Sequence, residues 1–206
     1  MSIEFWFDFH SPWAFLAATQ IGALARRHGL DVEWCPFHLP RLNEAIGGRR
    51  PMEENAAFVA WYRQDLQDWA GLYGETVRYH RQFPLRPARA LRAAIYAAEA
   101  GAGEPFILAV FRAYWSTNED ISDVTVLSRL GEACGLDGGA VAQATGSERY
   151  KVMLDSATQQ AIDAGLFGAP TMRWRGKLFF GNDRLALLDR FLGGDGPSVY
   201  ARRGKG

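Results

Sequence analysis

The stretch of sequence that decides the fold is residues 3–17, which read IEFWFDFHSPWAFLA. Residues 3–9 are aromatic and alternate in polarity, a pattern that is typical of a β-strand. Ser11 and Pro12 interrupt this strand, because a serine followed by a proline suits the N-cap and first turn of a helix. Asp8 lies inside the strand, where a charged side chain needs a partner, and we interpret it as structural.

The segments that follow complete a β-α-β unit. Residues 13–28 are rich in alanine and leucine and end in basic residues before Gly29, which predicts a helix with a glycine stop. Residues 31–38 predict a second strand. Strand, helix and strand in this order indicate a parallel pair joined by a right-handed crossover.

The middle of the chain carries no strand signal and predicts only helices. These helices are expected at residues 52–73, 88–100, 104–115, 124–135 and 138–145. The C-terminal part predicts a helix at 150–164, a hairpin of strands 171–174 and 178–180, and a last helix at 184–192.

This order predicts a discontinuous arrangement of domains. We expect residues 1–40 and 150–195 to share one sheet and residues 41–149 to form an inserted, all-helical domain. The glycine-rich residues 196–206 are expected to be a flexible tail.

Composition excludes several classes of function. The chain has 206 residues, of which 48% are hydrophobic and 22% charged, so it can bury a core without metals or disulfides. Its 23 basic and 23 acidic residues cancel, which argues against a nucleic-acid partner. No apolar run approaches the roughly 18 residues of a membrane span, and the N-terminus has no signal-peptide pattern.

The use of cysteine predicts a cytoplasmic location. Cys35 and Cys134 lie far apart in the sequence, and neither belongs to a CxxC pair or to a cluster with zinc spacing. We therefore expect two reduced cysteines and no metal site.

Three segments carry a resemblance to a known family: FWFDFHSPWAFLA at residues 5–17, FRAYWSTNEDISD at 111–123 and AGLFGAPTMRWRGKLFFGNDRL at 164–185. In this order and spacing they resemble the 2-hydroxychromene-2-carboxylate isomerases and the kappa-class glutathione transferases, in the DsbA-like branch of the thioredoxin superfamily. The resemblance implies an α/β thioredoxin-like fold with an inserted all-helical domain, and glutathione as cofactor.

The tetrapeptide 11–14 occupies the place where disulfide oxidoreductases of this fold carry Cys-Pro-x-Cys. Disulfide exchange needs an attacking thiolate, which neither Ser11 nor Ala14 supplies, so redox activity is not expected. Ser11 fits two roles. It is a helix N-cap by residue type, and the resemblance makes it the catalytic residue that donates a hydrogen bond to the glutathione sulfur, where the helix start favours a thiolate.

The resemblance assigns two further segments to glutathione. Pro170 would be a cis proline, and Ala169 before it would offer its backbone groups to the cysteinyl part of the tripeptide. Asn182 and Asp183 would meet the γ-glutamyl end, with Asp183 pairing with the α-ammonium group. By residue type alone, these segments are a turn and a helix cap.

Residues 47–51, Gly-Gly-Arg-Arg-Pro, correspond to a family loop that usually reads Gly-Asn-Lys-Pro-Pro. Arg49 keeps a cation there and is expected to hold a carboxylate of glutathione or substrate, unless the loop is simply solvated. Gly48 stands where the family commonly has asparagine, which leaves the identity of the substrate open.

Other residues are candidates for a substrate pocket. His10 lies beside Ser11 and fits either a proton-shuttling role or a structural one. Aromatic side chains that either wall a pocket for a flat ligand or belong to the core are Trp13, Phe37, Trp61 and Tyr62.

The leading interpretation is a glutathione-dependent isomerase of 2-hydroxychromene-2-carboxylate-type aromatic substrates. As the resemblance implies, a thiolate adds reversibly to the substrate, and the ring opens, a bond rotates and the thiolate leaves. Alternatives are a kappa-like glutathione transferase that conjugates an electrophile and a non-catalytic glutathione-binding protein. Family members are often dimers, so a homodimer is expected by analogy.

Overall fold

The computed structural model describes residues 1–48 and 54–194. The frame around the sheet consists of eight elements along the chain. They are β1 (Ser2–Phe7), α1 (Pro12–Arg27), β2 (Asp31–Pro36), α8 (Glu148–Asp163), β3 (Thr171–Trp174), β4 (Lys177–Phe180), the 3-10 helix η2 (Asn182–Arg184) and α9 (Leu185–Leu192).

The four strands form one mixed sheet in the order β2-β1-β3-β4. β1 and β2 are parallel, with Phe5 opposite Trp34, which confirms the predicted crossover through α1. β1 and β3 are antiparallel, with Phe5 opposite Met172, and β3 and β4 form a hairpin. Arg175 and Gly176 both have positive φ at the hairpin turn, as a tight two-residue turn between twisted strands requires.

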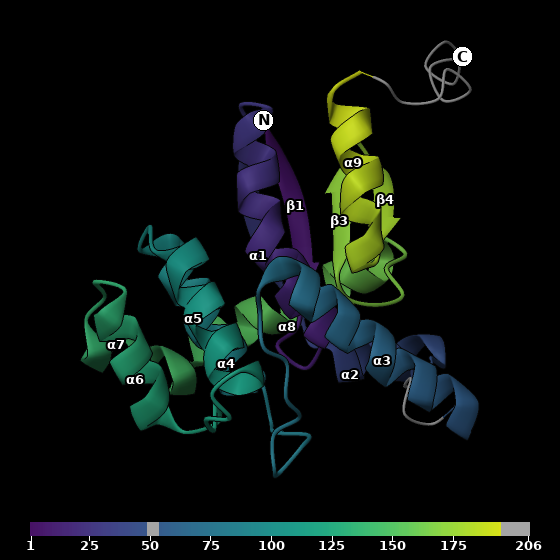
Figure 1. The fold of residues 1–206 in the computed structure, drawn as a ribbon. Coiled ribbons are helices and arrows are strands. Elements are labelled where there is room, and N and C mark those ends of the chain that lie inside the picture. Colours follow the sequence, from purple (N-terminus) through teal and green to yellow (C-terminus); the bar gives the residue numbers. More distant parts are fainter. Residues whose placement is uncertain (49–53, 195–206) are drawn as a thin grey trace.

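The other elements of the described residues are all helices. They are α2 (Leu39–Ile46), α3 (Ala56–Tyr73), α4 (Ala88–Glu99), α5 (Gly103–Trp115), α6 (Val124–Ala133) and α7 (Gly138–Gly146). Helix α4 contacts α5, α6, α7 and α8 and is the centre of this helical block, whereas α3 contacts α1 and extends away from its lower end in Figure 1. The described residues between 54 and 145 contain no strand, so the prediction of a thioredoxin-like fold with a helical insertion is confirmed.

Helix α2 is the element that the sequence analysis missed. The His38 Nδ1 atom accepts a hydrogen bond from the Arg41 amide at its start, and Gly47 ends it with a left-handed φ of 66°. This helix is short and has one buried residue, Leu42, so it carries almost no apolar period to detect. The strands β1 and β2 each end two residues earlier than predicted, because the chain turns towards the next helix.

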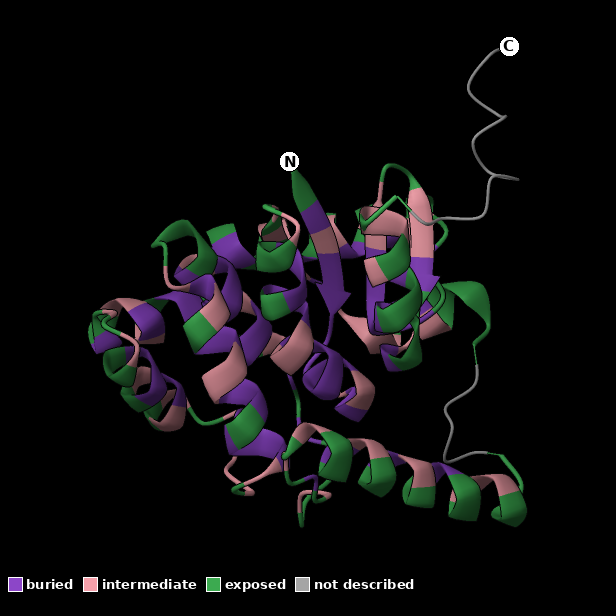
Figure 2. Cartoon of the chain, turned by 45° about the horizontal axis from the view of Figure 1, so that its top comes forward, coloured by how far each residue is buried: buried purple, intermediate pink, exposed green. Residues whose placement is uncertain are grey.

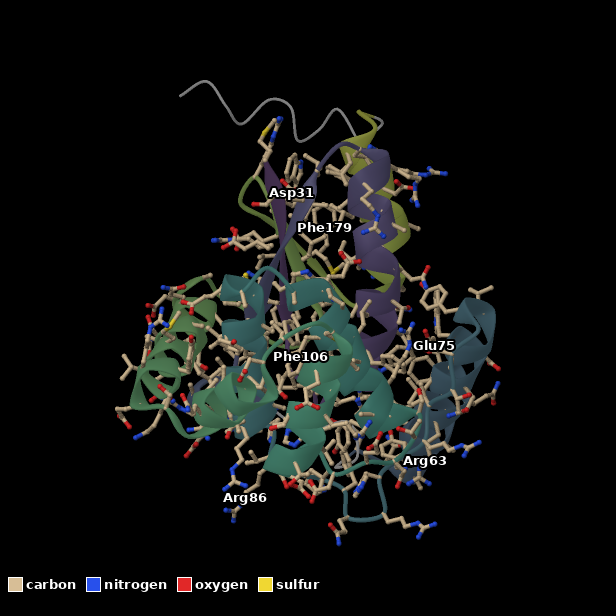
Figure 3. The ribbon with its side chains drawn as sticks, turned by 90° about the vertical axis from the view of Figure 1, so that its left-hand side faces the viewer. Asp31, Arg63, Glu75, Arg86, Phe106 and Phe179 are labelled. Carbon is tan, nitrogen blue, oxygen red and sulfur yellow. The ribbon has the colours of Figure 1, made fainter. Side chains whose placement is uncertain are left out.

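The core joins the sheet to the helical block. Phe7 and Phe9 from the β1 end pack against Phe111 of α5, with ring centroids 5.7 and 4.7 Å apart. Figure 2 shows buried residues running through the sheet and into the helices, while α3 is exposed along much of its length. Figure 3 places Phe106 in the helical block and Phe179 in the sheet, and both are buried. One continuous cluster of buried side chains therefore connects the two parts.

Helices α1 and α9 are tied together by a charged cluster at the end of α1. The Asp189 carboxylate of α9 accepts from His28 Nε2 at 2.6 Å and from Arg27 at 3.1 Å. The hydrogen bond from His28 is the main reason that the pKa of Asp189 lies below its usual value, and Arg27 adds to the effect.

We expect Asp189→Ala to destabilise the protein near neutral pH and to have little effect in acid. Because the folded-state pKa is lowered, the stabilisation is fully present above the unfolded pKa near 4 and is lost as the pH falls through the folded value. Asp189 is partly exposed, so solvent screening limits the loss to about 0.5–1 kcal/mol. Urea unfolding of the wild type and of Asp189→Ala at pH 6 and pH 3 measures this loss of stability. Glu148→Ala, which removes an exposed ion pair with Lys151, is the control. An equal loss for Asp189→Ala at both pH values would contradict the prediction.

Candidate functional site

The turn between β1 and α1 places Ser11 at the start of α1. Ser11 has extended backbone angles, and its Oγ accepts a hydrogen bond from the Ala14 amide at 3.1 Å, so it is the N-cap of the helix. Its own amide donates to the Asp8 carbonyl at 3.0 Å. Ser11 is 5% exposed, which places its hydroxyl at the edge of the buried region.

The first turn of α1 leaves one backbone donor available. Pro12 has no N–H group, the Ala14 amide is bound by Ser11 Oγ, and the Phe15 amide donates to the Ser11 carbonyl at 3.1 Å. Among the described residues, the Trp13 amide has no hydrogen-bond partner. A helix start with a free N–H group favours an anion.

The Ser11 hydroxyl also reaches the segment before β3. Its Oγ donates to the Ala169 carbonyl at 2.9 Å, and the Ala169–Pro170 peptide bond is cis, as the resemblance implied. The structure therefore brings Ser11 and Ala169 together across 158 positions of sequence. It also shows that the single hydroxyl proton of Ser11 is already engaged, which residue type alone could not reveal.

The start of the last helix lies beside the same proline. The Gly181 amide donates to the Pro170 carbonyl at 3.0 Å. Gly181 has φ 105° and ψ 153°, and a Cβ there would lie 2.6 Å from Asp183 Oδ1, so only glycine fits. Asp183 is half-exposed and forms an ion pair with Arg184 at 3.3 Å.

Asn182 has an unusual environment. Its side chain is 3% exposed, and neither its amide nitrogen nor its amide oxygen has a hydrogen-bond partner within the described residues. A buried amide without partners costs about 1–3 kcal/mol per group, so this side chain is suited to a polar ligand.

Helix α3 contributes two residues that the sequence analysis did not single out. Burial raises the pKa of Asp65, and the nearby carboxylates of Asp68 and Asp183 raise it further. Burial also raises the pKa of Tyr73, and the Asn182 side chain nearby partly offsets this effect, although no hydrogen bond of normal geometry joins the two. Neither residue carries a local motif, because α3 meets η2 only in the folded chain.

His10 is tied to the helical block. Its Nε2 atom meets the Leu85 carbonyl, which can only accept, so His10 is a donor at this nitrogen. The His10 amide donates to the Asp8 carboxylate at 2.9 Å. These contacts favour the structural role for His10.

The aromatic candidates do not form one pocket wall. Trp13 and Tyr62 meet edge to face with ring centroids 5.6 Å apart. Phe37 is fully buried against Trp6, so its assignment to a pocket wall is corrected, since a side chain without exposed surface belongs to the core. Trp61 lies beside Tyr62 in the sequence but is 55% exposed, because neighbouring helix positions face different sides.

The sequence analysis missed two other aromatic side chains near this turn. The ring of Phe83 lies 6.5 Å from the His10 ring and 5.3 Å from the Tyr79 ring. Both precede α4 in a segment without periodicity, so only the folded contacts reveal them.

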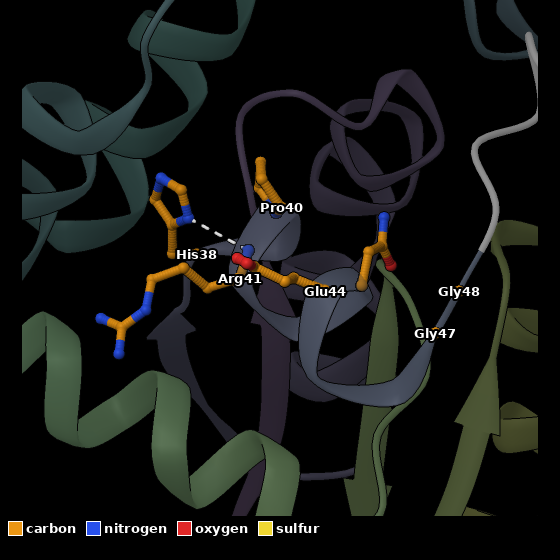
Figure 4. A pocket seen from close by; sticks show the side chains of 7 residues that line it. His38, Pro40, Arg41, Glu44, Gly47 and Gly48 are labelled. Atoms are coloured by element: carbon orange, nitrogen blue, oxygen red, sulfur yellow. Dashed lines mark hydrogen bonds between the residues drawn. The ribbon is translucent and has the colours of Figure 1, made fainter.

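A separate open cavity of about 530 Å³ lies along α2 (Figure 4). It contains none of the predicted site residues within the described part of the chain. Its lining is polar and consists of His38, Pro40, Arg41, Asn43, Glu44, Gly47 and Gly48. Arg49, the expected carboxylate-binding cation, lies outside the described residues.

Cys35 and Cys134 are not paired with each other, and burial raises the pKa of both thiols. Within residues 1–48 and 54–194, no group of three or more histidine, cysteine or acidic side chains is placed to hold a metal ion. No helix in these ranges is long and apolar enough to cross a membrane.

Comparison with known proteins agrees with the fold. Residues 2–193 match the family model of the DSBA-like thioredoxin domain. A 2-hydroxychromene-2-carboxylate isomerase from Sphingobium xenophagum is 32% identical over 93% of this chain and 97% of its own length. Another from Pseudomonas putida is 31% identical over 94% of this chain and 95% of its own length. A solved structure of 2-hydroxychromene-2-carboxylate isomerase superposes with a TM-score of 0.85 at 28% identity, covering 94% of this chain and 95% of that one.

The chain belongs to the 2-hydroxychromene-2-carboxylate isomerase family of DSBA-like thioredoxin proteins. In this member of the family, the start of α1 carries Ser11 and Ala14, and neither side chain contains sulfur. Disulfide exchange needs a thiolate at this place. The site therefore offers a hydroxyl and a free amide where a redox relative would offer a nucleophile.

Proposed function

We propose that the protein is a glutathione-dependent isomerase that acts on 2-hydroxychromene-2-carboxylate or a closely similar aromatic carboxylate. The observation that carries the proposal is that two hydrogen-bond donors lie at the start of α1. They are the unpartnered Trp13 amide and the Ser11 hydroxyl. This pair is suited to an anionic sulfur, and the names of the relatives supply the reaction class.

The residues present fit glutathione at several points. Among the described residues, the Trp13 amide and the Ala169 amide have no hydrogen-bond partner, and these would meet the sulfur and the cysteinyl backbone. The unpartnered amide of Asn182 would bind the γ-glutamyl end. The carboxylates of Asp65 and Asp183 make the local electrostatic potential more negative, which favours an ammonium group there.

Bound glutathione would supply a thiolate that adds reversibly to the substrate. The chain supplies the conditions for this chemistry. The positive end of α1 and the Trp13 amide stabilise negative charge at the sulfur. The Ser11 hydroxyl would turn from the Ala169 carbonyl to the sulfur, and the edge-to-face rings of Trp13 and Tyr62 offer apolar contact for an aromatic substrate.

The gain from turning the Ser11 hydroxyl is smaller than the full strength of its new bond. A hydrogen bond to a charged group contributes about 1.5–3 kcal/mol, and the neutral bond given up contributes about 0.5–1.5 kcal/mol. The difference is roughly 1 kcal/mol, or somewhat less than one unit of thiol pKa. The helix start therefore carries a substantial part of the expected effect on the thiol pKa.

The test is turnover of 2-hydroxychromene-2-carboxylate by the wild-type protein with glutathione, with S-methylglutathione and with no thiol. We expect conversion to the ring-opened isomer only with glutathione, because S-methylglutathione keeps the tripeptide but cannot ionise. Conversion without thiol would contradict the role of glutathione. Conjugation of an electrophilic aromatic without isomerisation would favour a transferase, and binding without any conversion would favour a binding protein.

A further inference from the structure

The carbonyl of Phe9, two residues before Ser11, is held by a side chain of the helical block. The indole Nε1 of Trp115 donates to it at 2.9 Å. Trp115 is the last residue of α5 and is completely buried, so this bond is shielded from water. Strand β1 has already ended at Phe7, and the sheet does not pair with this carbonyl.

A second link runs beside the first. His10 meets the Leu85 carbonyl through Nε2, and the Leu85 amide donates to the Tyr114 hydroxyl at 3.4 Å. Tyr114 and Trp115 are neighbours at the end of α5 with ring centroids 4.8 Å apart. The end of α5 therefore fixes the Ser11 turn through both Phe9 and His10.

The other side of the turn is held by the sheet frame. The Asp8 carboxylate accepts from the His10 and Leu39 amides, and the Asp8 carbonyl accepts from the Ser11 amide. Every peptide unit from Asp8 to Ser11 thus has a fixed direction. Loss of the Trp115 bond would leave the Phe9 carbonyl buried without a partner, which favours rotation of the peptide unit that connects it to His10.

We propose that Trp115 is a positioning residue for the Ser11 site, acting through the Phe9 carbonyl. The proposal rests on the proposed function for its catalytic consequence. Its structural part stands independently, because the orientation of the Ser11 and Trp13 amides can be measured without any ligand. The indole N–H group, rather than the bulk of the ring, is what positions the turn.

The matched control is Trp6 in β1. Its indole Nε1 donates to the Glu4 carboxylate at 2.9 Å, and its side chain is 4% exposed. Trp6→Phe therefore removes the same kind of group from another buried tryptophan, which lies in the sheet rather than at the end of α5. Glu4 keeps its two bonds to Arg173, so no backbone group near Ser11 is affected.

The first measurement is amide hydrogen exchange and chemical shift in the ligand-free protein. We expect Trp115→Phe to speed exchange of the Ser11 amide at least tenfold and to shift the Ser11 and Trp13 resonances. Trp6→Phe is expected to leave both unchanged. A Ser11 amide that exchanges equally slowly in wild type and Trp115→Phe would overturn the proposal, whatever the outcome of the turnover test.

The second measurement is turnover against pH in single and double variants. Trp115→Phe is expected to lower kcat/KM about three- to tenfold at neutral pH, with part of the loss recovered at higher pH. In the Ser11→Ala background the same change is expected to cost clearly less than in the wild-type background, because the Ser11 hydroxyl that the turn positions is gone while the Trp13 amide remains. Equal losses in both backgrounds would show that Trp115 is only structural.

A replacement that preserves the shape of the ring is used if Trp115→Phe fails to fold. β-(3-benzothienyl)alanine at position 115 replaces the indole N–H group with sulfur and preserves the shape of the ring. We expect this variant to fold and to reproduce the faster exchange at Ser11. Wild-type exchange at Ser11 in this variant would contradict the role of the indole N–H group.

Discussion

Asp8→Ala is expected to lower the free energy of unfolding by about 2–4 kcal/mol, since it leaves two partly buried backbone amides without their acceptor. The Asp8 carboxylate is fully buried and accepts from His10 N at 2.9 Å and from Leu39 N at 2.8 Å. Each unsatisfied N–H group costs about 1–3 kcal/mol, and relief from burying a charge offsets part of the total. Chemical denaturation at neutral pH measures the loss.

Two further variants serve as comparisons, one at Asp8 itself and one at an exposed carboxylate. Asp8→Asn keeps one acceptor oxygen and is expected to lose about half as much stability as Asp8→Ala. Asp31→Ala removes an exposed carboxylate from the start of β2 and is expected to change stability by less than about 0.5 kcal/mol. Asp8→Ala with wild-type stability would show that the carboxylate does not hold the turn.

Ser11→Ala is expected to lower turnover with glutathione about tenfold at neutral pH. The variant loses the hydrogen bond available to the sulfur, the cap on Ala14 and the contact with Ala169. If the pKa of the bound thiol rises by about one unit, the thiolate fraction falls tenfold below that pKa and is unchanged well above it. Most of the loss should therefore be recovered at alkaline pH, and a pH profile of kcat/KM checks this.

A cap elsewhere in the molecule provides the control for Ser11. Asp137 caps α7 by accepting from the Ala140 amide at 2.6 Å. Asp137→Ala also removes a helix cap, at a cost of about 1 kcal/mol of stability, but far along the chain from the proposed site. We expect normal turnover from it. A tenfold loss in Ser11→Ala that stays constant across pH would contradict a role in ionising the thiol.

The elements with strong local signals could be predicted from the sequence. The aromatic alternation of β1 and the Ser11-Pro12 cap mark the first strand and helix, and the two strands around Arg175-Gly176 follow from turn chemistry. Helix α2 was not predicted, because a single buried leucine gives no helical periodicity of apolar residues. The sequence also could not separate the fully buried Phe37 from the half-buried Trp13, because both are aromatic residues beside a turn.

The candidate site depended more on the folded chain. The resemblance placed Ser11, Ala169 and Asn182 in one site, and the structure joins the first two directly and the third through Gly181 and Pro170. Asp65, Tyr73 and Trp115 could not be predicted, since they reach the site from distant helices. The engagement of the Ser11 proton by Ala169 likewise follows only from three-dimensional contact.

The most direct test of the proposed thiolate site is titration of glutathione bound to the wild-type protein. Thiolate absorbance in the ultraviolet is followed against pH with glutathione saturating, and S-methylglutathione supplies the baseline. We expect the bound thiol to ionise at least one pH unit below the free thiol, and Ser11→Ala to shift the curve about one unit upward. Coincidence of the bound and free curves would contradict a thiolate site at the start of α1.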